Sequence, residues 1–271
     1  MSIDRYLPSD VKLFDSHAHL YDGRYDEYDA LSGLRDEMIK QLPEMNIERV
    51  MCVSSSITSA KQAKSIAEKY PFVCFSAGVH PQDAATSGET ANMEEELTEL
   101  LKHEKCMALG EIGLDYHYDE PPKETQKAVF IRQLELAKKL DVPVIIHNRD
   151  SDGEMMDILK KYDLPLLMHC FSSSNEIAKL AIKRGYYISL AGTVTFKNAR
   201  SLHEIAQTVP LEKLLIETDC PYLTPEPYRG KRNYPALVGY TAMKIAELRG
   251  ITVEEVAKIT YDNAVKFYRI K

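Results

Sequence analysis

The chain has 271 residues, of which 44% are hydrophobic, so it can bury a large core. It contains no run of about 18 apolar residues and no signal-peptide core near its first residue, which predicts a protein without a membrane span. Its net charge of −7 argues against a protein that coats nucleic acid through a broad basic surface, but it allows an enzyme that grips one strand end through metal ions and a few cations.

Eight short apolar stretches, many of them rich in β-branched residues, are predicted to form strands. In chain order they lie near residues 12–19, 48–55, 72–80, 106–112, 143–147, 164–170, 186–191 and 213–219. Because most of these stretches are apolar without interruption, their strands are expected to form a parallel sheet that helices cover on the outside.

Amphipathic segments of helical length separate and follow these strands. In residues 126–140, Phe130, Leu134 and Ala137 recur at spacings of four and three, and charged residues lie off that stripe. The predicted helices span 59–69, 92–102, 126–140, 152–161, 175–184, 199–208, 237–249 and 253–268. The alternation predicts an α/β protein, a (β/α)8 TIM barrel that forms a single domain over residues 1–271. An open doubly wound sheet is the alternative, but no G-x-G-x-x-G or P-loop motif follows any strand.

The five cysteines are odd in number, scattered along the chain, and mostly placed inside apolar runs. They are Cys52, Cys74, Cys106, Cys170 and Cys220. This distribution predicts reduced, buried thiols and a cytoplasmic location rather than a disulfide framework. Since no C-x-x-C pair occurs, a cysteine zinc site is not expected.

The first predicted strand ends in residues 15–20, DSHAHL. Because side chains alternate along a strand, His17 and His19 point to the same side, where two imidazoles can hold one divalent ion. For this motif alone, a pair of surface histidines on an edge strand is an equal alternative.

The positions of other histidines and acids in the sequence favour a metal site over a pair of surface histidines. Glu111, His147, His169 and Asp219 each end a predicted strand, at the edge where a (β/α)8 barrel carries its chemistry. Four imidazoles and two carboxylates suit two divalent ions that share one acid. A structural zinc site is disfavoured, because such sites usually take four ligands dominated by cysteine.

We expect one ion between the two histidines of the first strand and the acid of the eighth, and a second ion between the histidines of strands five and six. Glu111, at the end of the fourth strand, is expected to bridge them, because a carboxylate offers an oxygen to each ion. The predicted ligands are His17, His19, Glu111, His147, His169 and Asp219. This mixed set suits Zn²⁺, Mn²⁺, Co²⁺ or Ni²⁺, and Mg²⁺ where water molecules complete the shell.

Six blocks of the sequence resemble the motifs of the TatD-type metal-dependent deoxyribonucleases and occur in that family's order. They are DSHAHL (15–20), GVHP (78–81), GEIGLDY (110–116), PVIIH (143–147), MHCF (168–171) and ETDCPYL (217–223). The resemblance runs from residue 13 to Asn263 and Ala264, and so covers essentially the whole chain.

That family is part of the wider amidohydrolase-like superfamily and has a (β/α)8 barrel with two metal ions. The resemblance therefore implies the same fold, and the same six ligands, in this chain. Members are described as Mg²⁺-stimulated DNases, typically 3′→5′ exonucleases, so the resemblance implies DNA as substrate, single-stranded or at a 3′ end. Many relatives in the superfamily end strand four with a carboxylated lysine, whereas this chain has Glu111, as TatD-type proteins do.

Further catalytic roles are expected at the same edge of the sheet. Asp219 is expected to accept the proton of the attacking water in addition to binding a metal. Asp15 shares the parity of His17 and is a candidate to orient an imidazole, with a capping or turn aspartate as the alternative. The resemblance favours His80 as a contact to the scissile phosphate or a proton donor to the leaving group, rather than a buried structural histidine.

The remaining histidines are given smaller roles. His117, together with Asp115, follows Glu111 on the same face and is expected near the substrate without an assigned function. His103 and His203 fall inside predicted helices and are expected to be solvated.

Residues 228–234, YRGKRNY, follow the eighth strand and place three cations between two tyrosines. In an acidic chain this segment predicts phosphate binding by Arg229 and Lys231, and stacking of a base on a flanking tyrosine. Barrels often bind phosphate near strands seven and eight. A solvated loop is the alternative, and Arg149 is a second candidate for phosphate binding.

Three functions remain open at the level of sequence. The metal ligands and the basic loop favour a phosphodiesterase that acts on DNA ends. A hydrolase of an amide or ester bond in a small molecule or aminoacyl conjugate would use the same metals and water. A catalytically silent binding or scaffold barrel is disfavoured, because it would need none of the six ligands. A monomer or weak oligomer is expected.

Overall fold

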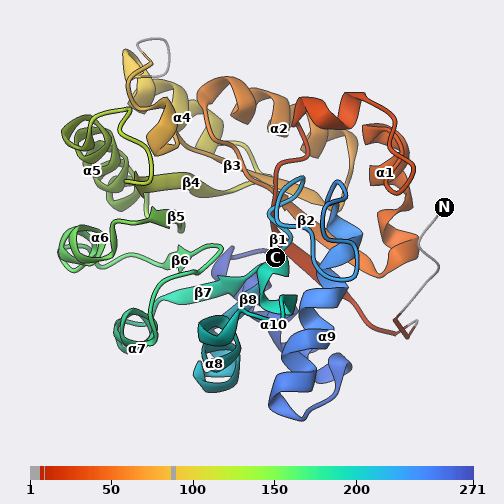
Figure 1. The fold of residues 1–271 in the computed structure, drawn as a ribbon. Helices are drawn as coiled ribbons and strands as arrows, with labels where there is room; N and C mark the ends of the chain where they lie inside the picture. The colour runs from red at the N-terminus through yellow and green to blue at the C-terminus, as the bar shows by residue number, and fades with distance from the viewer. Residues whose placement is uncertain (1–6, 9, 87–89) are drawn as a thin grey trace.

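The computed structural model describes residues 7, 8, 10–86 and 90–271, and within them eight parallel strands form one sheet in the order β1 to β8. Figure 1 shows the strands following one another around a cylinder with helices outside it. The strands are β1 (Leu13–Ala18), β2 (Ile47–Cys52), β3 (Val73–Ala77), β4 (Cys106–Asp115), β5 (Val144–Arg149), β6 (Leu166–Met168), β7 (Tyr187–Leu190) and β8 (Leu214–Ile216). Backbone hydrogen bonds from Asp219 N to His17 O (2.9 Å) and from His19 N to Cys220 O (2.8 Å) join the two ends of the sheet. The predicted (β/α)8 barrel is confirmed.

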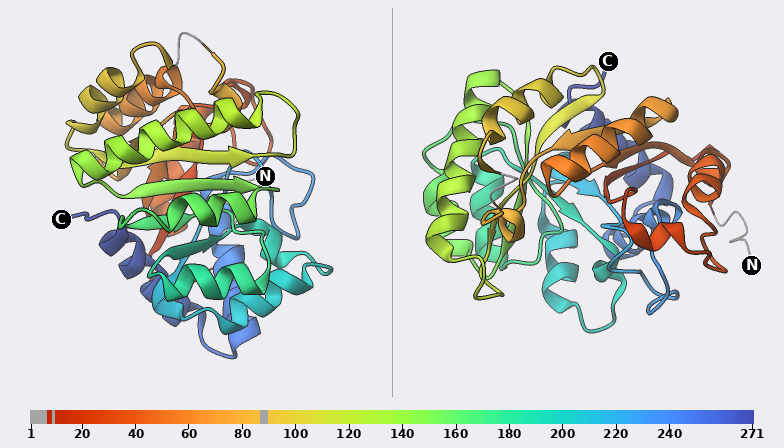
Figure 2. Two further views of the ribbon diagram at one scale, coloured as in Figure 1. Left: turned by 90° about the vertical axis from the view of Figure 1, so that its left-hand side faces the viewer. Right: turned by 90° about the horizontal axis from the view of Figure 1, so that it is seen from above.

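The α-helices alternate with the strands and pack on their outer face, as α5 does along β4 in the left view of Figure 2. They are α1 (Arg35–Gln41), α2 (Ile57–Lys69), α4 (Met93–Leu101), α5 (Lys123–Leu140), α6 (Asp152–Leu159), α7 (Asn175–Lys183), α8 (Arg200–Thr208), α9 (Val238–Arg249) and α10 (Val253–Phe267). The sequence did not predict α1, because only Met38 and Ile39 of its seven residues are buried and so short a stripe shows no periodicity. None of the described helices combines the length and the apolar character that crossing a bilayer requires.

Short 3-10 helices complete the connections. They are η1 (Gly23–Asp26), η2 (Leu42–Met45), η3 (Pro81–Asp83), η4 (Gly192–Thr195), η5 (Leu211–Lys213) and η6 (Pro235–Leu237). Of these, η3 begins directly after His80 and turns the chain away from the end of β3.

A layer of buried side chains fills the amino end of the cylinder. Each strand contributes to it: Phe14, Met51, Cys74, Ala108, Ile145, Leu167, Tyr187 and Leu215. Phe267 and Tyr268, at the end of α10, pack against this layer and close that end. His147, His169 and Glu217 come two residues after Ile145, Leu167 and Leu215 of this layer; His147 lies within β5, and the other two directly follow β6 and β8. The polar residues therefore lie directly next to this packed layer, on its carboxyl side.

Six of the described strands end sooner than the sequence predicts, and β6 and β8 are two of them. They stop at Met168 and Ile216, and the following residues leave the sheet. Cys170 and Asp219 then adopt positive φ angles of 43° and 54°. Non-glycine residues rarely adopt such angles, and those that do often lie at functional sites. The chain thus turns sharply at Asp219 and directly after His169, two of the residues predicted to bind metal.

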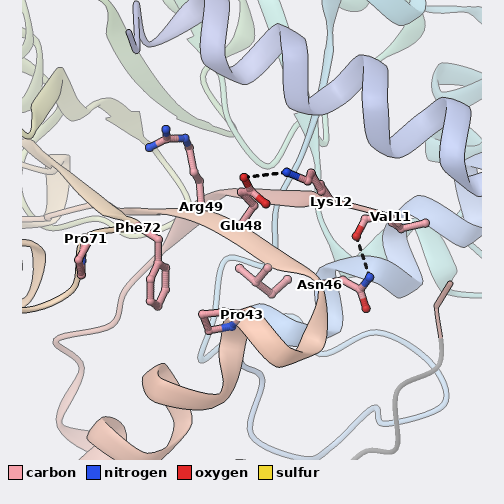
Figure 3. A pocket seen from close by; sticks show the side chains of 9 residues that line it. Val11, Lys12, Pro43, Asn46, Glu48, Arg49, Pro71 and Phe72 are labelled. Carbon is pink, nitrogen blue, oxygen red and sulfur yellow. Dashed lines mark hydrogen bonds and ion pairs between the residues drawn. The ribbon is translucent and has the colours of Figure 1, made fainter. Parts of the chain in front are cut away.

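A cavity of about 450 Å³ lies at the amino end of the barrel, beside the first residues of β1, β2 and β3 (Figure 3). An ion pair between Lys12 and Glu48 (3.0 Å) and a hydrogen bond from the Asn46 side chain to Val11 O (2.7 Å) lie in its wall. The described residues that line it include neither histidine nor cysteine. In this fold the amino end of the barrel contributes to stability, and active sites lie at the carboxyl ends of the strands.

All five cysteines carry free thiols. Cys52, Cys74 and Cys220 are buried, as predicted, and burial raises the pKa of the Cys52 thiol to about 12. Cys106 and Cys170 are only partly buried, because they lie where the chain enters or leaves a strand.

Candidate metal centre

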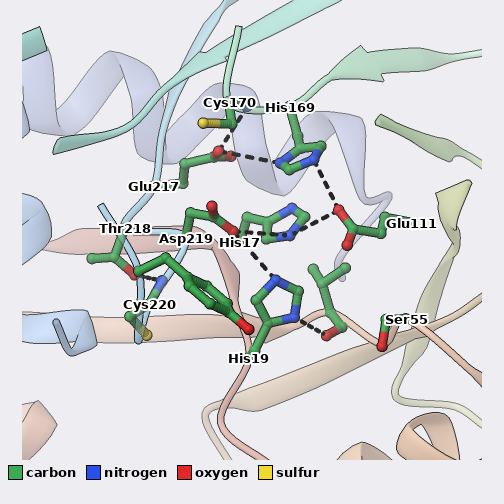
Figure 4. Close-up of polar contacts among 12 residues, drawn as sticks. His17, His19, Ser55, Glu111, His169, Cys170, Glu217, Thr218, Asp219 and Cys220 are labelled. Atoms are coloured by element: carbon green, nitrogen blue, oxygen red, sulfur yellow. Dashed lines mark hydrogen bonds and ion pairs between the residues drawn. The ribbon is translucent and has the colours of Figure 1, made fainter. Parts of the chain in front are cut away.

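The Glu111 carboxylate faces His17 and His169 beyond the carboxyl ends of the strands (Figure 4). Its Oε2 atom is 2.8 Å from His169 Nε2, 3.4 Å from His17 Nε2 and 3.9 Å from His147 Nδ1. Three strands, β1, β4 and β5, and the segment after β6 supply these side chains. Residues remote in sequence therefore meet at one carboxylate.

Asp219 adds a second carboxylate to the same cluster. Its Oδ1 atom is 3.2 Å from His19 Nε2 and 3.7 Å from His17 Nε2. The side chain of Asp219 is 15% exposed, whereas His17 is completely buried, so Asp219 lies nearer the mouth. The structure thus brings all six predicted ligands together.

Among the described residues, four sets of side chains have the spacing of a metal site, and two of these sets contain Glu111. One nitrogen each from His17 and His19 and one oxygen of Glu111 lie within 4.8 Å of one another. The same holds for Glu111, His147 and His169. Because Glu111 belongs to both sets, the arrangement matches two ions that share a carboxylate.

The pKa shifts within the cluster differ between its histidines. Burial, reinforced by the adjacent His169 ring, lowers the pKa of His17 well below its usual range, and neither of its ring nitrogens has a hydrogen-bond partner in the described part of the chain. Burial opposes ionisation of Glu111, yet the nearby histidines, His169 first, hold the pKa of this carboxyl well below its usual range. Burial likewise opposes protonation of His169, yet Glu111 raises the pKa of this imidazole well above its usual range. A divalent metal takes an ionised carboxylate and unprotonated nitrogens, so metal binding would release a proton from His169.

In three of the histidines, the ring nitrogen that does not face Glu111 or Asp219 contacts another group. His19 Nδ1 lies 2.9 Å from the carbonyl oxygen of Val53, and His147 Nε2 lies 3.4 Å from Asp115 Oδ2. His169 Nδ1 lies 3.4 Å from Glu217 Oε1. Such contacts fix the ring and leave the opposite nitrogen for the metal.

Glu217 also belongs to this site, although no role is predicted for it from the sequence. Glu217 is completely buried, and its Oε1 also accepts a hydrogen bond from the backbone N–H of Cys170 (2.8 Å). It shares the parity of Leu215 and Asp219, which places it on the inner face. The signal in the sequence was an acidic residue at an inward-facing position near the end of the predicted eighth strand.

Asp15 lies against the backbone of this site. Its carboxylate accepts hydrogen bonds from the backbone N–H (2.9 Å) and the hydroxyl (2.6 Å) of Thr218. It has a longer contact of 3.4 Å with the backbone N–H of His17 and none with an imidazole among the described residues. Asp15 therefore ties the loop that carries Asp219 to the strand that carries His17.

His80 lies beside Glu111 with a defined tautomer. Its Nδ1 accepts a hydrogen bond from the backbone N–H of Gln82 (3.1 Å), so the neutral ring carries its proton on Nε2, which is 3.8 Å from Glu111 Oε1. Burial, with His147 close by, lowers the pKa of His80 to about 3. His80 is thus a neutral N–H donor at neutral pH.

Comparison with known proteins shows where this chain belongs. The protein family described as TatD related DNase matches residues 14–269. The chain belongs to the TatD family. With the cluster described above, this makes it a metal-dependent hydrolase of that family.

Individual relatives of this TatD-family chain match it over nearly their whole length. The uncharacterized metal-dependent hydrolase YabD of Bacillus subtilis is 43% identical over 95% of this chain and 99% of that protein. YcfH of Escherichia coli, which carries the same description, is 36% identical over 95% of this chain and 96% of that protein. The crystal structure of YjjV, a TatD homologue from Escherichia coli, superposes with a TM-score of 0.84 at 26% identity, covering 96% and 98% of the two chains.

Two cavities are lined by predicted metal ligands of this TatD-family barrel, and a third adjoins them at Arg149. Their volumes are about 410, 470 and 590 Å³. Arg149 lines all three, and Tyr222 lines the first two. His117 lines the largest, where its Nδ1 lies 3.0 Å from Asp150 Oδ2. Arg149 is the cation best placed to meet a phosphate there.

The basic loop of residues 228–234 lies outside these cavities. The guanidinium of Arg229 stacks over the ring of Phe196 (4.2 Å), and Lys231 is exposed. Arg232 donates hydrogen bonds to the Ser32 hydroxyl and is held there. Tyr234 is buried, with 3% of its surface exposed, so of the two flanking tyrosines it is not available to stack on a base. The sequence shows the charge of this loop, but it does not show which of its side chains are engaged in contacts within the folded protein.

Two other histidines differ from their expected state. His103 Nε2 lies 3.4 Å from a carboxylate oxygen of Glu68, and His203 Nε2 lies 2.9 Å from the carbonyl oxygen of Val194. Both side chains are partly buried, so the expectation that they are solvated is wrong. His203 thus links α8 to η4, and His103, which follows α4, contacts α2.

Proposed function

We propose that this TatD-family hydrolase cleaves phosphodiester bonds of DNA as a 3′→5′ exonuclease on single-stranded ends. The observation that carries the proposal is the position of Glu111, whose Oε2 lies between the ring nitrogens of three histidines at 2.8 to 3.9 Å. A shared carboxylate of this kind suits two divalent ions, and a pair of ions suits displacement at phosphorus. The family described as TatD related DNase supports DNA as the substrate.

The proposed centre holds its ions in two groups that meet at Glu111. The first consists of His17, His19 and Asp219, and the second of His147 and His169. When bound, divalent ions activate a water molecule and neutralise charge on the phosphate oxygens. The donor set suits Mg²⁺, Mn²⁺, Zn²⁺, Co²⁺ or Ni²⁺.

Two side chains would handle protons and charge around the reacting phosphate. Asp219 engages the histidines through Oδ1, so we assign its second oxygen to accept the proton of the attacking water. His80 presents an N–H on Nε2, which we assign to an oxygen of the scissile phosphate. Because the pKa of His80 is about 3, we favour this contact over proton donation to the leaving group.

The decisive experiment removes and restores the metal. Metal-free protein is given Mg²⁺, Mn²⁺ or Zn²⁺ and incubated with end-labelled single-stranded DNA and, separately, with a panel of small esters and amides. A ladder of products one nucleotide apart, abolished by EDTA, is the expected result. Cleavage of the small molecules alone would replace the proposal with the amide or ester hydrolase, and inactivity with every metal would favour a binding protein.

Arg149 should control the affinity for the strand. Substitution of Arg149 by Met removes a cation from all three cavities, so KM for single-stranded DNA is expected to rise. Loss of one phosphate contact should make the slope of log affinity against log salt shallower by about 0.7. Steady-state assays over a series of salt concentrations measure both.

The matched variant replaces Arg229 and Lys231 together. If these loop cations bind the backbone of the strand beyond the cavities, the double variant should also flatten the salt dependence, with a smaller rise in KM than the Arg149 variant. An unchanged salt slope would remove the loop from the binding surface. An unchanged KM after Arg149→Met would show that Arg149 does not bind the strand.

We place this activity in the cytoplasm and in a monomer or weak oligomer. The free thiols, three of them buried, support a reducing compartment. Sedimentation velocity of the purified protein tests the oligomeric state.

A further inference from the structure

Tyr222 lines two of the cavities at the mouth of the barrel, those of about 410 and 470 Å³. Both cavities reach the predicted metal ligands, because five of these ligands line the smaller cavity and three line the larger one. The residues that the two cavities share are His147, Arg149, His169, Asp219 and Tyr222. A substrate whose phosphate lies at the cluster can therefore extend into either cavity.

The two cavities differ in chemistry. The smaller one is lined by three carboxylates beyond the predicted ligands, which disfavours an apolar group. The larger one has the side chains of Leu202 and Leu223 in its wall, with the hydroxyls of Ser172 and Thr193. Among the described residues that line it, Asp219 is the sole acid. An apolar wall with a few hydroxyls suits a planar heteroaromatic group that has polar atoms at its edge.

The ring of Tyr222 is held in place before any ligand binds. The guanidinium of Arg24 lies over one face, 4.1 Å from the ring centroid. Arg24 is in turn held by two hydrogen bonds to the carboxylate of Asp22 (2.9 and 2.8 Å). The His19 ring meets Tyr222 at an interplanar angle of 79°, so the two rings are not stacked face to face. With 45% of its surface exposed, Tyr222 offers a fixed aromatic face beside the metal cluster.

We propose that the 3′-terminal nucleobase of the DNA strand binds in the larger cavity, stacked on Tyr222 and bounded by Leu202 and Leu223. The inference rests on the proposed DNA substrate and adds a subsite that recognises the aromatic face of a base. Stacking of this kind is tolerant of sequence, because every base has such a face. A volume of about 470 Å³ is in the range of pockets that hold a small ligand.

The test measures binding rather than cleavage. Short 5′-labelled single strands, with either a normal or an abasic 3′-terminal residue and a phosphorothioate last linkage, are titrated with Mg²⁺-loaded protein and followed by fluorescence anisotropy. The unmodified protein should bind the normal end about tenfold more tightly than the abasic end. Tyr222→Ala should bind both ends as weakly as the unmodified protein binds the abasic one. Tyr222→Phe, which keeps the ring, should retain the difference.

Two further variants separate stacking from loss of structure. Tyr28→Ala removes a tyrosine that is 74% exposed and lines none of the three cavities, and it should bind like the unmodified protein. Leu202→Trp should fill the larger cavity and weaken binding of the normal end alone. A melting curve of each variant verifies that it is folded.

The outcomes separate the subsite from the proposed function. Equal binding of normal and abasic ends by the unmodified protein overturns the subsite and leaves DNA as the substrate. A Tyr222→Ala variant that weakens both ends alike gives the ring a structural role only, which also overturns it. Failure to bind any strand overturns the DNA function and the subsite with it.

Discussion

Replacement of Asp219 by Asn is expected to lower kcat for DNA cleavage by about a thousandfold, with little change in the melting temperature. Asparagine has the shape of aspartate but cannot accept the proton of the attacking water. Because the side chain is partly exposed at the mouth and lies outside the hydrophobic core, its replacement should cost little stability. Initial rates at saturating strand concentration, together with thermal melting, measure the two effects separately.

The control for this variant is Asp119→Asn, which makes the same chemical change at an exposed residue outside the three cavities. It should leave kcat unchanged. A nearly normal kcat for Asp219→Asn would show that another group accepts the proton, and the role assigned to Asp219 would be withdrawn.

Replacement of Glu111 by Gln is expected to weaken metal binding at least a hundredfold and to abolish cleavage with it. The substitution removes the negative charge at the point where the two groups of histidines meet. It also removes the second oxygen donor that a bridging ligand must supply. Metal content after dialysis, and calorimetric titration of the metal-free protein, measure the loss without relying on activity.

Glu104→Gln is the matched control, since Glu104 is exposed and precedes β4 at the opposite end of the barrel. Its metal content should equal that of the unmodified protein. Retention of two ions per chain by Glu111→Gln would rule out the bridging role, and the shared-carboxylate centre would have to be abandoned.

The barrel and the metal cluster were predictable for the same physical reason. Strands buried on both faces leave uninterrupted apolar runs, and a closed parallel sheet brings the carboxyl ends of those runs to one rim. His17 and Glu111 are 94 positions apart in the chain, yet both were placed by finding the end of a strand.

Side chains on the loops were less predictable, because their surroundings come from several segments at once. Tyr234 and Arg232 looked available in the sequence, but one is buried and the other is hydrogen-bonded to Ser32 from the distant η1–α1 connection. Tyr222 carried no signal of its own, since the guanidinium on its face comes from Arg24, almost 200 residues earlier. Local pattern cannot reveal such pairings.

Among the described residues, Phe267 and Tyr268 pack against the side-chain layer that fills the amino end of the cylinder, so the candidate site is reached from the carboxyl end. For an exonuclease this geometry forbids threading, so the shortened strand and the released nucleotide must depart through the opening by which the strand arrived. Digestion should then proceed by repeated encounters rather than in one continuous run, and a trap of unlabelled DNA added after the first turnover would halt it.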